Sequence, residues 1–323
     1  MKINKINPSL LSFILAITIF ITSCTTNKST YKVALIAPFT GLYREIGYQA
    51  ITGSQIAIRN YNQAKPKYLP QLELVAFDDA GDPVKAAEQA QNILTDKQIV
   101  AVVGHWLDET TSAAANIYKH SKLIVISTSS EPSRILGSQH WFFSLYPTSE
   151  TIYSKMESLS KKHNIPNICN CDLYSGLNLL NTITDETHID NPSAIGGTLW
   201  SLNTFQELVG SDSHKTIFLS PIPNPLVDTS TNKVFTEKHR SLYPDRSDPN
   251  LIALHAFEAI NIITHSIRQS KSIDHDSIGK SLSNIDYTGT IGKIQFNKEG
   301  RWKDPQLITY TWNNKDLSLW QTK

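Results

Sequence analysis

The sequence predicts an α/β protein whose central sheet is parallel and buried on both faces. Its strand-like segments are continuous apolar runs, without the alternation of apolar and polar residues that marks a half-exposed strand. Segments with helical apolar spacing separate these runs, which is the order expected when crossover helices join parallel strands. The 323 residues are enough for one large domain or two ordinary ones.

The first half of the chain alternates strand and helix regularly. Its clearest helix start is Asp82–Pro83, because aspartate is a favoured N-cap and proline fits the first helical position. Strands are expected at 32–38, 72–79, 99–104, 122–127 and 141–145, and helices at 50–62, at 82–94 and from about 108. Ligands of a parallel sheet lie beyond the carboxyl ends of its strands. The loops of interest are therefore 38–47, 78–82, 104–111 and 127–133.

The second half of the chain is less regular. We expect a helix at 149–164, then a strand, a loop and a helix within 165–186, and turns over 189–201. A strand that runs into prolines is expected at 214–225, and the longest amphipathic helix of this half at 248–270. The tail, 289–312, predicts strands joined by a turn at Lys298–Gly300.

Residues 1–24 have the layout of an export signal. Lys2 and Lys5 precede an apolar run over 10–21 that is too short for a comfortable membrane span. The segment Ile21–Cys24 resembles a bacterial lipobox, which implies cleavage before Cys24, lipidation of that cysteine and a polar tether over 25–30. The protein would then be anchored to a membrane outside the cytoplasm. The alternative is an ordinary signal peptide with an incidental cysteine.

Cys169 and Cys171 are the other two cysteines. In an exported protein an even pair suggests a disulfide, but one intervening residue makes the ring small and easily reduced. A metal site would need further ligands, and no histidine or other cysteine lies nearby at a useful spacing. An unbonded or weakly bonded pair is the slightly favoured interpretation.

Charge and motifs exclude several functions. Lysine plus arginine (30) nearly balance aspartate plus glutamate (29), which gives no support for nucleic acid as a partner. The sequence has no Gly-x-Ser-x-Gly elbow, phosphate-cradling loop or His-Glu-x-x-His pattern, so an enzyme is not expected and a hydrolase is a remote third hypothesis. His105 and His255 are expected to be structural, and no metal or cofactor is predicted.

Four stretches resemble the type I periplasmic binding proteins of the branched-chain amino acid (leucine/isoleucine/valine) receptor kind. They match its first strand, ligand loop and helix, its Asp-Asp-x-x-x-Asp-Pro turn, its third and fourth strands with both ligand loops, and its closing hairpin. The stretches are 32–58, 77–94, 102–136 and 291–312. The resemblance covers 31–147 and 248–315 well and the region between them weakly.

The resemblance implies two Rossmann-like lobes joined by three crossings, with the ligand held in the cleft between them. The first lobe would hold 31–147 and 249–287, and the second 148–248 and 288–323. The second lobe is shorter than the family's, as if one or two strand–helix units were missing between Thr184 and Ala194. A monomer that delivers its ligand to an ABC permease is implied as well.

The resemblance also places the expected ligand contacts. Asp108 stands where the family usually has a serine that holds a carboxylate, and the loop with Ser129 and Ser130 is one residue short. Asp108 would repel a carboxylate and attract an ammonium or hydroxyl group, or it would only cap a helix by accepting from Thr110 or Thr111. The predicted ligand-binding residues are Tyr43, Arg44, Trp106, Asp108, Thr110, Ser129, Ser130, Tyr174 and Trp200.

Several of these residues have an ordinary alternative role. Arg44 would supply an anion partner or be a solvated surface charge, and Trp106 would wall the pocket or pack on the sheet. The leading hypothesis is a lipid-anchored solute-binding protein of an ABC importer, for an amino acid or similar small polar molecule. The alternative is a degenerate receptor that acts as a sensor or interaction module without a transported ligand.

Overall fold

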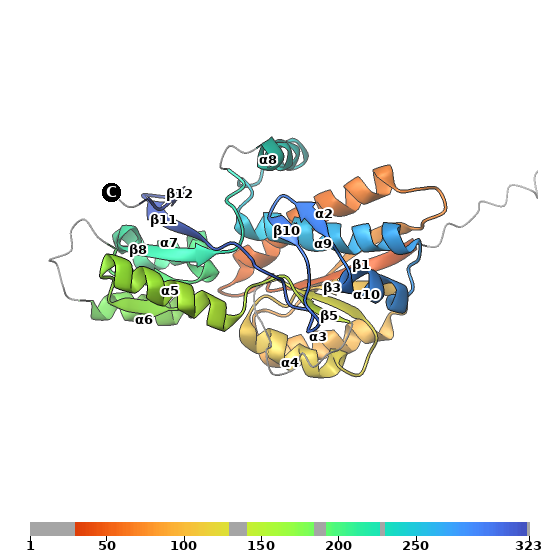
Figure 1. Cartoon of the computed structure of the whole chain (residues 1–323), viewed down its shortest axis with the longest axis horizontal. Coiled ribbons are helices and arrows are strands. Elements are labelled where there is room, and N and C mark those ends of the chain that lie inside the picture. The colour runs from red at the N-terminus through yellow and green to blue at the C-terminus, as the bar shows by residue number, and fades with distance from the viewer. Residues whose placement is uncertain (1–29, 129–140, 184–191, 227–229, 322–323) are drawn as a thin grey trace, which may run out of the picture.

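The computed structural model describes residues 30–128, 141–183, 192–226 and 230–321, and these form two α/β lobes side by side (Figure 1). The predicted α/β class with parallel sheets is confirmed. The predicted signal peptide, Cys24, Ser129 and Ser130 lie outside the described residues. Within the described ranges, no helix is long and apolar enough to cross a membrane.

The first lobe is built on a five-stranded parallel sheet in the order β2-β1-β3-β4-β5. Its strands are β1 (Thr30–Ala37), β2 (Gln71–Asp78), β3 (Ile99–Val103), β4 (Ile124–Ser127) and β5 (Phe142–Ser144). One face packs on α2 (Arg44–Ala64), α9 (Leu251–Ser270) and α10 (His275–Ser283), and the other on α3 (Pro83–Thr95) and α4 (Asp108–Tyr118). Because both faces are covered, every residue of β3 and β4 is buried, as the unbroken apolar runs predict.

The second lobe has a mixed five-stranded sheet in the order β12-β11-β8-β7-β6, of which the last three strands are parallel. Its strands are β6 (Asn167–Cys169), β7 (Ala194–Gly196), β8 (Thr216–Ser220), β11 (Ile308–Asn313) and β12 (Asp316–Leu319). One face is covered by α5 (Ser149–His163), the other by α6 (Leu173–Thr182), η1 (Thr198–Ser201), α7 (Asn203–Val209) and η2 (Gly210–Lys215). This sheet also has five strands, but three of them are parallel and the other two join as an antiparallel pair, whereas all five strands of the first sheet are parallel.

The chain passes between the lobes at places that differ from the expected boundaries. Helix α8 (Ser230–Leu242), expected within the second lobe, instead packs on the first: His239 lies 3.1 Å from Thr52 Oγ1, and Phe235 packs on Phe257. The hairpin of β9 (Tyr287–Gly289) and β10 (Gly292–Ile294) was also expected in the second lobe. It lies on the first, since Thr290 N–H donates to Glu258 at 2.8 Å. The crossings therefore fall after β5, between β8 and α8, and near residue 305.

Local sequence signals explain several element boundaries. Asp82 caps α3 through the N–H groups of Val84 and Lys85, with Pro83 at the first helical position, as predicted. The predicted turn at Lys298–Gly300 is confirmed by the Gly300 N–H bond to Asn297 O and by the antiparallel bridge between Phe296 and Trp302. Strand β7 lies where only turns were expected, and helix α7 lies where no element was predicted, because elements this short show no periodicity.

Candidate functional site

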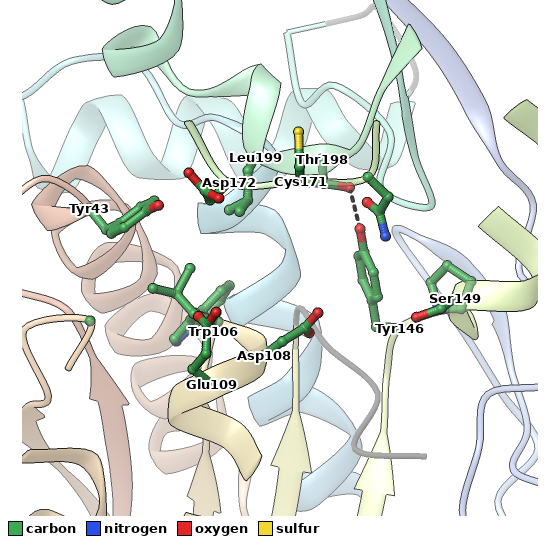
Figure 2. Close-up of a pocket in the computed structure, with 14 residues that line it drawn as sticks. Tyr43, Trp106, Asp108, Glu109, Tyr146, Ser149, Cys171, Asp172, Thr198 and Leu199 are labelled. Carbon is green, nitrogen blue, oxygen red and sulfur yellow. Dashed lines mark hydrogen bonds between the residues drawn. The ribbon is translucent and has the colours of Figure 1, made fainter. Parts of the chain in front are cut away.

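A cleft between the two lobes is the candidate site (Figure 2). Its volume is about 310 Å³, at the lower end of the roughly 300–1,000 Å³ typical of small-molecule sites. Loops at the carboxyl ends of strands from both sheets form its walls, which is where parallel sheets place their ligands. Its lining residues are Tyr43, Gly81, Trp106, Leu107, Asp108, Glu109, Tyr146, Pro147, Ser149, Asn170, Cys171, Asp172, Thr198 and Leu199.

The wall from the first lobe follows β3. Gly104 has a φ of +122°, and a Cβ atom there would come within 2.1 Å of the carbonyl oxygen of Ile36, so only glycine fits this turn. The turn carries Trp106, 1% exposed, to the edge of the cleft. Helix α4 then begins at Asp108, so that Asp108 and Glu109 both line the cavity from its first turn.

The alternative that Asp108 caps this helix is wrong. The N-cap of α4 is Leu107, whose backbone is extended, and no side chain caps the helix. Asp108 is instead the first helical residue, and its carboxylate lies on the cleft side in Figure 2. A single-residue shift of the helix start thus decides whether this carboxylate binds its own helix or faces the cavity.

The wall from the second lobe follows β6 and β7. Cys169 and Cys171 form a disulfide across the turn after β6, contrary to the interpretation slightly favoured from the sequence. Two cysteines with one residue between them can be bonded here because the turn brings their Cα atoms to 5.2 Å, which is within the usual range for a disulfide. Asn170, Cys171 and Asp172 line the cleft from the turn, and Thr198 and Leu199 line it from η1.

Asp172 has a structural role besides its place in the cleft. Its Oδ1 accepts from the N–H groups of Tyr174 and Ser175, at 2.9 and 3.0 Å, and so caps α6. Its Oδ2 accepts from Ser175 Oγ at 2.6 Å. Partial burial alone would raise the pKa of Asp172, but these hydrogen bonds outweigh it, and the pKa lies below its usual value. Asp172 is therefore an anion at neutral pH.

Tyr146 joins the first crossing to the far wall. Its hydroxyl donates to Thr198 Oγ1 at 2.9 Å, and Thr198 in turn donates to the carbonyl of Leu219 at 3.2 Å. Burial raises the pKa of Tyr146 to about 12; the bond with Thr198 works in the opposite direction and the nearby charge of Asp108 adds to the rise. The phenol is therefore a neutral donor fixed at one end of the cleft.

The described part of the lining is acidic. Asp108, Glu109 and Asp172 contribute carboxylates, and no lysine, arginine or histidine is among the lining residues in the described ranges. The pKa of Tyr43 is raised, first by burial and then by the charge of Asp172, with Glu109 adding to the effect. The described lining thus carries three carboxylates, with Trp106, Tyr43 and Tyr146 as its aromatic residues.

Two buried histidines lie behind this lining. His105 Nδ1 is 2.9 Å from Asp79 Oδ2, and both side chains are fully buried. His255 contacts the edges of Trp106 and Tyr146, with ring centroids at 6.0 and 6.4 Å, and its Nε2–H donates to the carbonyl of Leu145 at 2.7 Å. These two side chains support the residues that line the cleft and do not line it themselves.

The structure brings together some of the predicted site residues and separates others. Tyr43, Trp106 and Asp108 line the cleft. Arg44 starts α2 with an exposed side chain away from the lining, and Tyr174, 56% exposed, points outward from α6. Thr110 is buried and donates to the carbonyl of Leu107, at 3.0 Å.

Trp200 was expected to face the ligand but belongs to the core of the second lobe. It is fully buried and stacks on Phe205 with ring centroids 4.7 Å apart, because η1 turns its side chain toward the helices. Sequence reasoning missed the lining residues Glu109, Tyr146, Asn170, Asp172 and Thr198. Asp172 had a usable signal, since an aspartate directly before a helical apolar pattern is an N-cap candidate.

No group of three or more histidine, cysteine, aspartate or glutamate side chains in the described ranges is arranged to hold a metal ion. Asp108, Glu109 and Asp172 lie on the lining of the cleft, and Asp172 also accepts three hydrogen bonds from Tyr174 and Ser175. Such an arrangement binds and orients a small molecule.

Comparisons with known proteins agree with this geometry. Residues 30–169 match the model of a family described as periplasmic binding protein. A leucine-, isoleucine-, valine-, threonine- and alanine-binding protein from Pseudomonas aeruginosa is 34% identical over 106 residues, 33% of this chain and 28% of that protein. The match thus spans just over a quarter of that relative's length.

Solved structures extend the likeness to most of the chain. A leucine-binding protein from Thermotoga maritima has a TM-score of 0.75 at 14% identity, over 90% of this chain and 98% of that one. A branched-chain amino acid transporter substrate-binding protein from Streptococcus pneumoniae, solved with isoleucine, has a TM-score of 0.73 at 16% identity, again over 90% and 98%. At such identities these structures establish the fold. The resemblance and the fold expected from the sequence are confirmed.

Proposed function

Because this chain is a relative of the periplasmic binding proteins of branched-chain amino acids and has the fold of their type I members, we propose that it is an extracytoplasmic solute-binding protein. Its ligand is an amino acid or a similar small polar molecule, held between the two lobes. The observation that carries the proposal is the cleft itself, which both sheets line with loops at the carboxyl ends of their strands.

The charge of the cleft favours ligands that present a positive group. Asp108, Glu109 and Asp172 would attract an ammonium group, and Tyr43 and Trp106 would pack on an apolar or cationic side chain. A carboxylate would be repelled unless it binds away from these three residues. The relatives named for leucine, isoleucine and valine support an amino acid, while the acidic lining supports one held mainly through its ammonium end.

Anchoring and transport complete the proposal. Lipidation at Cys24 would hold the protein at the membrane surface through the tether 25–30, and an ABC permease would receive the ligand. The transport relationship is supported by the name of the similar protein from Streptococcus pneumoniae. Metabolic labelling with a palmitate analogue tests the anchor, because replacement of Cys24 by alanine would abolish the label.

A thermal-shift screen tests the binding function. The protein is heated with amino acids, amino acid amides, polyamines and short sugars, each at high concentration. A ligand at a hundred times its dissociation constant would add about 2.7 kcal/mol to the free energy of unfolding, an easily measured shift. Compounds with an ammonium group are expected to give the largest shifts. A panel in which no compound raises the melting temperature would contradict the proposal.

One observation favours a second candidate, a sensor or interaction module without a transported ligand. The second sheet has three parallel strands where the first has five, so the lobe that closes over the ligand is reduced. This candidate predicts a fixed angle between the lobes. Ligand-induced compaction, measured by small-angle scattering, would exclude it.

A further inference from the structure

Glu45 makes an unusual contact between the lobes. It lies in the first turn of α2 in the first lobe, and its carboxylate accepts four hydrogen bonds from the start of α7 in the second lobe. Oε1 accepts from the backbone N–H and from Nδ2 of Asn203, both at 3.1 Å. Oε2 accepts from the backbone N–H and from Oγ1 of Thr204, at 3.0 and 3.1 Å. One residue thus binds two consecutive residues of the other lobe.

Helix α7 has no capping side chain of its own. Its N-cap residue is Leu202, which offers no acceptor, and the first N–H groups of a helix have no partner within it. The carboxylate of Glu45 supplies the missing acceptor from 158 residues away in the sequence. These N–H groups therefore have a hydrogen-bond partner within the protein only while the two lobes keep this relative position.

Glu45 is also held in place from its own side. Nδ2 of Asn250 donates to Oε1 at 3.2 Å, and Asn250 is the N-cap of α9, a helix of the first lobe. One turn further along α2, Gln49 accepts from the backbone N–H of Asn250 at 3.2 Å and donates to the carbonyl of Asp248 at 3.3 Å. These bonds fix the start of α2 and the start of α9 to each other, so the carboxylate is directed at α7.

The same contact connects the two walls of the cleft. Tyr43, which lines the first wall, is two residues before Glu45, and Thr198 and Leu199, which line the second, lie in η1 just before α7. Movement of α7 away from Glu45 would carry η1 away from Tyr43. We infer that Glu45 is a positioning residue, a clasp that holds the lobes in the closed arrangement and so sets the shape of the cleft.

The expected effect follows from the strength of such bonds. Hydrogen bonds to a carboxylate are about twice as strong as neutral ones. Without the carboxylate, the N–H groups of Asn203 and Thr204 gain partners only from water, which favours lobes that are further apart. If only the closed form binds the ligand, the apparent affinity is proportional to the fraction of molecules that are closed, so it falls as that fraction falls. In this last respect the inference rests on the proposed binding function.

The test is hydrogen–deuterium exchange of the full chain in a mild detergent, without ligand, read by mass spectrometry of peptides that contain Asn203 and Thr204. The variants are Glu45→Ala, Glu45→Gln, which keeps one acceptor oxygen, and Glu88→Ala, an exposed glutamate of α3, as the matched control. These amides are expected to exchange about tenfold faster in Glu45→Ala. Glu45→Gln should fall between it and wild type, and Glu88→Ala should equal wild type.

Closure itself needs a second readout. Small-angle neutron scattering with the detergent contrast-matched is expected to show a larger radius of gyration for Glu45→Ala than for Glu88→Ala. Should Glu45→Ala fail to fold, the pair Asn203→Ala with Thr204→Val removes the side-chain donors from the other lobe. That variant should move both readouts in the same direction by a smaller amount.

The inference would be overturned if neither the exchange rate nor the radius of gyration changed in Glu45→Ala. If Glu45→Ala does not fold, the same holds for the paired variant. Because both readouts are taken without ligand, this failure is separate from failure of the proposed function. If both readouts change as expected but no compound of the panel binds, the inference about Glu45 stands and only the proposed binding function is contradicted. With a compound that does bind, affinity should weaken about tenfold in Glu45→Ala.

Discussion

The two lobes differ in how their sheets are built: the first has five parallel strands, and the second has three parallel strands and an antiparallel pair. In the first lobe, β3 and β4 are buried along their whole length between two layers of helices. In the second lobe, β6 is only three residues long and partly exposed, and β7 is equally short. A parallel sheet needs cover on both faces, and the second lobe has less sheet to cover and fewer helices to cover it. Its stability must come from elsewhere.

Aromatic packing supplies part of that stability. Trp200 stacks on Phe205 at 4.7 Å, Phe218 stacks on Tyr310 at 5.6 Å, and Trp312 Nε1–H donates to the carbonyl of Trp200 at 2.9 Å. The remainder comes from the first lobe, through the Glu45 clasp and the bond from Tyr146 to Thr198. Large aromatic side chains therefore form much of the core of the second lobe, and its contacts with the first lobe join the two.

The largest expected effect is the loss of that aromatic core. Trp200→Ala should destabilise the protein by about 3–5 kcal/mol, because it removes a fully buried ring and leaves a cavity. Denaturant unfolding followed by circular dichroism should then show two steps, with the second lobe unfolding first. Phe143→Ala is the matched change in the first lobe, where Phe143 packs on Phe296 at 4.9 Å. A single shared transition in both variants would contradict the difference between the lobes.

The second effect concerns acid stability where the lobes meet. Burial lowers the pKa of His255 to about 4, so the folded protein holds a neutral ring that donates to Leu145. In the unfolded chain the ring binds the proton with the ordinary histidine pKa of 6.5. The stabilisation is therefore complete above pH 6.5 and is lost as the pH falls toward 4, on the order of 3 kcal/mol in total.

His255→Asn keeps a donor for Leu145 without a titrating ring. Its unfolding free energy, measured between pH 7 and 4, should fall less steeply than that of wild type. His120→Asn is the matched control, because it makes the same substitution at an exposed histidine just after α4. Identical slopes for wild type and His255→Asn would show that the ring is not held neutral.

The smallest expected effect compares one helix cap in each lobe. Asp82 caps α3 and Asp172 caps α6, each by accepting two backbone N–H groups. Replacement of either by alanine should cost about 1 kcal/mol. Hydrogen exchange should show more local opening of α6 in Asp172→Ala than of α3 in Asp82→Ala, because α6 has 10 residues and α3 has 13, so that the cap serves a larger share of α6. Equal protection of the two helices would remove this distinction between the lobes.

The sequence predicted the first lobe better than the second for a physical reason. Long buried strands and a capped helix such as the one that begins after Asp82 leave patterns that can be read locally. The three-residue strands β6 and β7 leave almost none, and α7 depends on a cap from Glu45 that the local sequence does not contain. Family resemblance placed Tyr43, Trp106 and Asp108 in the cleft correctly. It failed for Tyr174, which is 56% exposed on α6, and the separate prediction of Trp200 failed because that ring packs in the core of the second lobe.

The cleft as a whole could not be read from local signals. Tyr146 lies in a crossing, and its role depends on Thr198, which is 52 residues away. Whether Asp108 is a cap or a lining residue depends on where α4 starts, within a single residue. Contacts of this kind are set by tertiary packing, which periodicity and capping signals do not report.

The central claim is that the ligand binds between the lobes, and a variant that fills the cleft tests it most directly. Leu199 lines the cavity, whose volume is about 310 Å³, and Leu199→Trp would place a large ring in its wall. Leu226→Trp adds the same group at a position that is 50% exposed and outside the lining. Calorimetric titration with the compound that gives the largest thermal shift should show affinity reduced about a hundredfold or more in Leu199→Trp, equivalent to about 2.7 kcal/mol. Leu226→Trp should bind as wild type does. Equal affinity in all three proteins would show that the ligand binds elsewhere and would contradict the account.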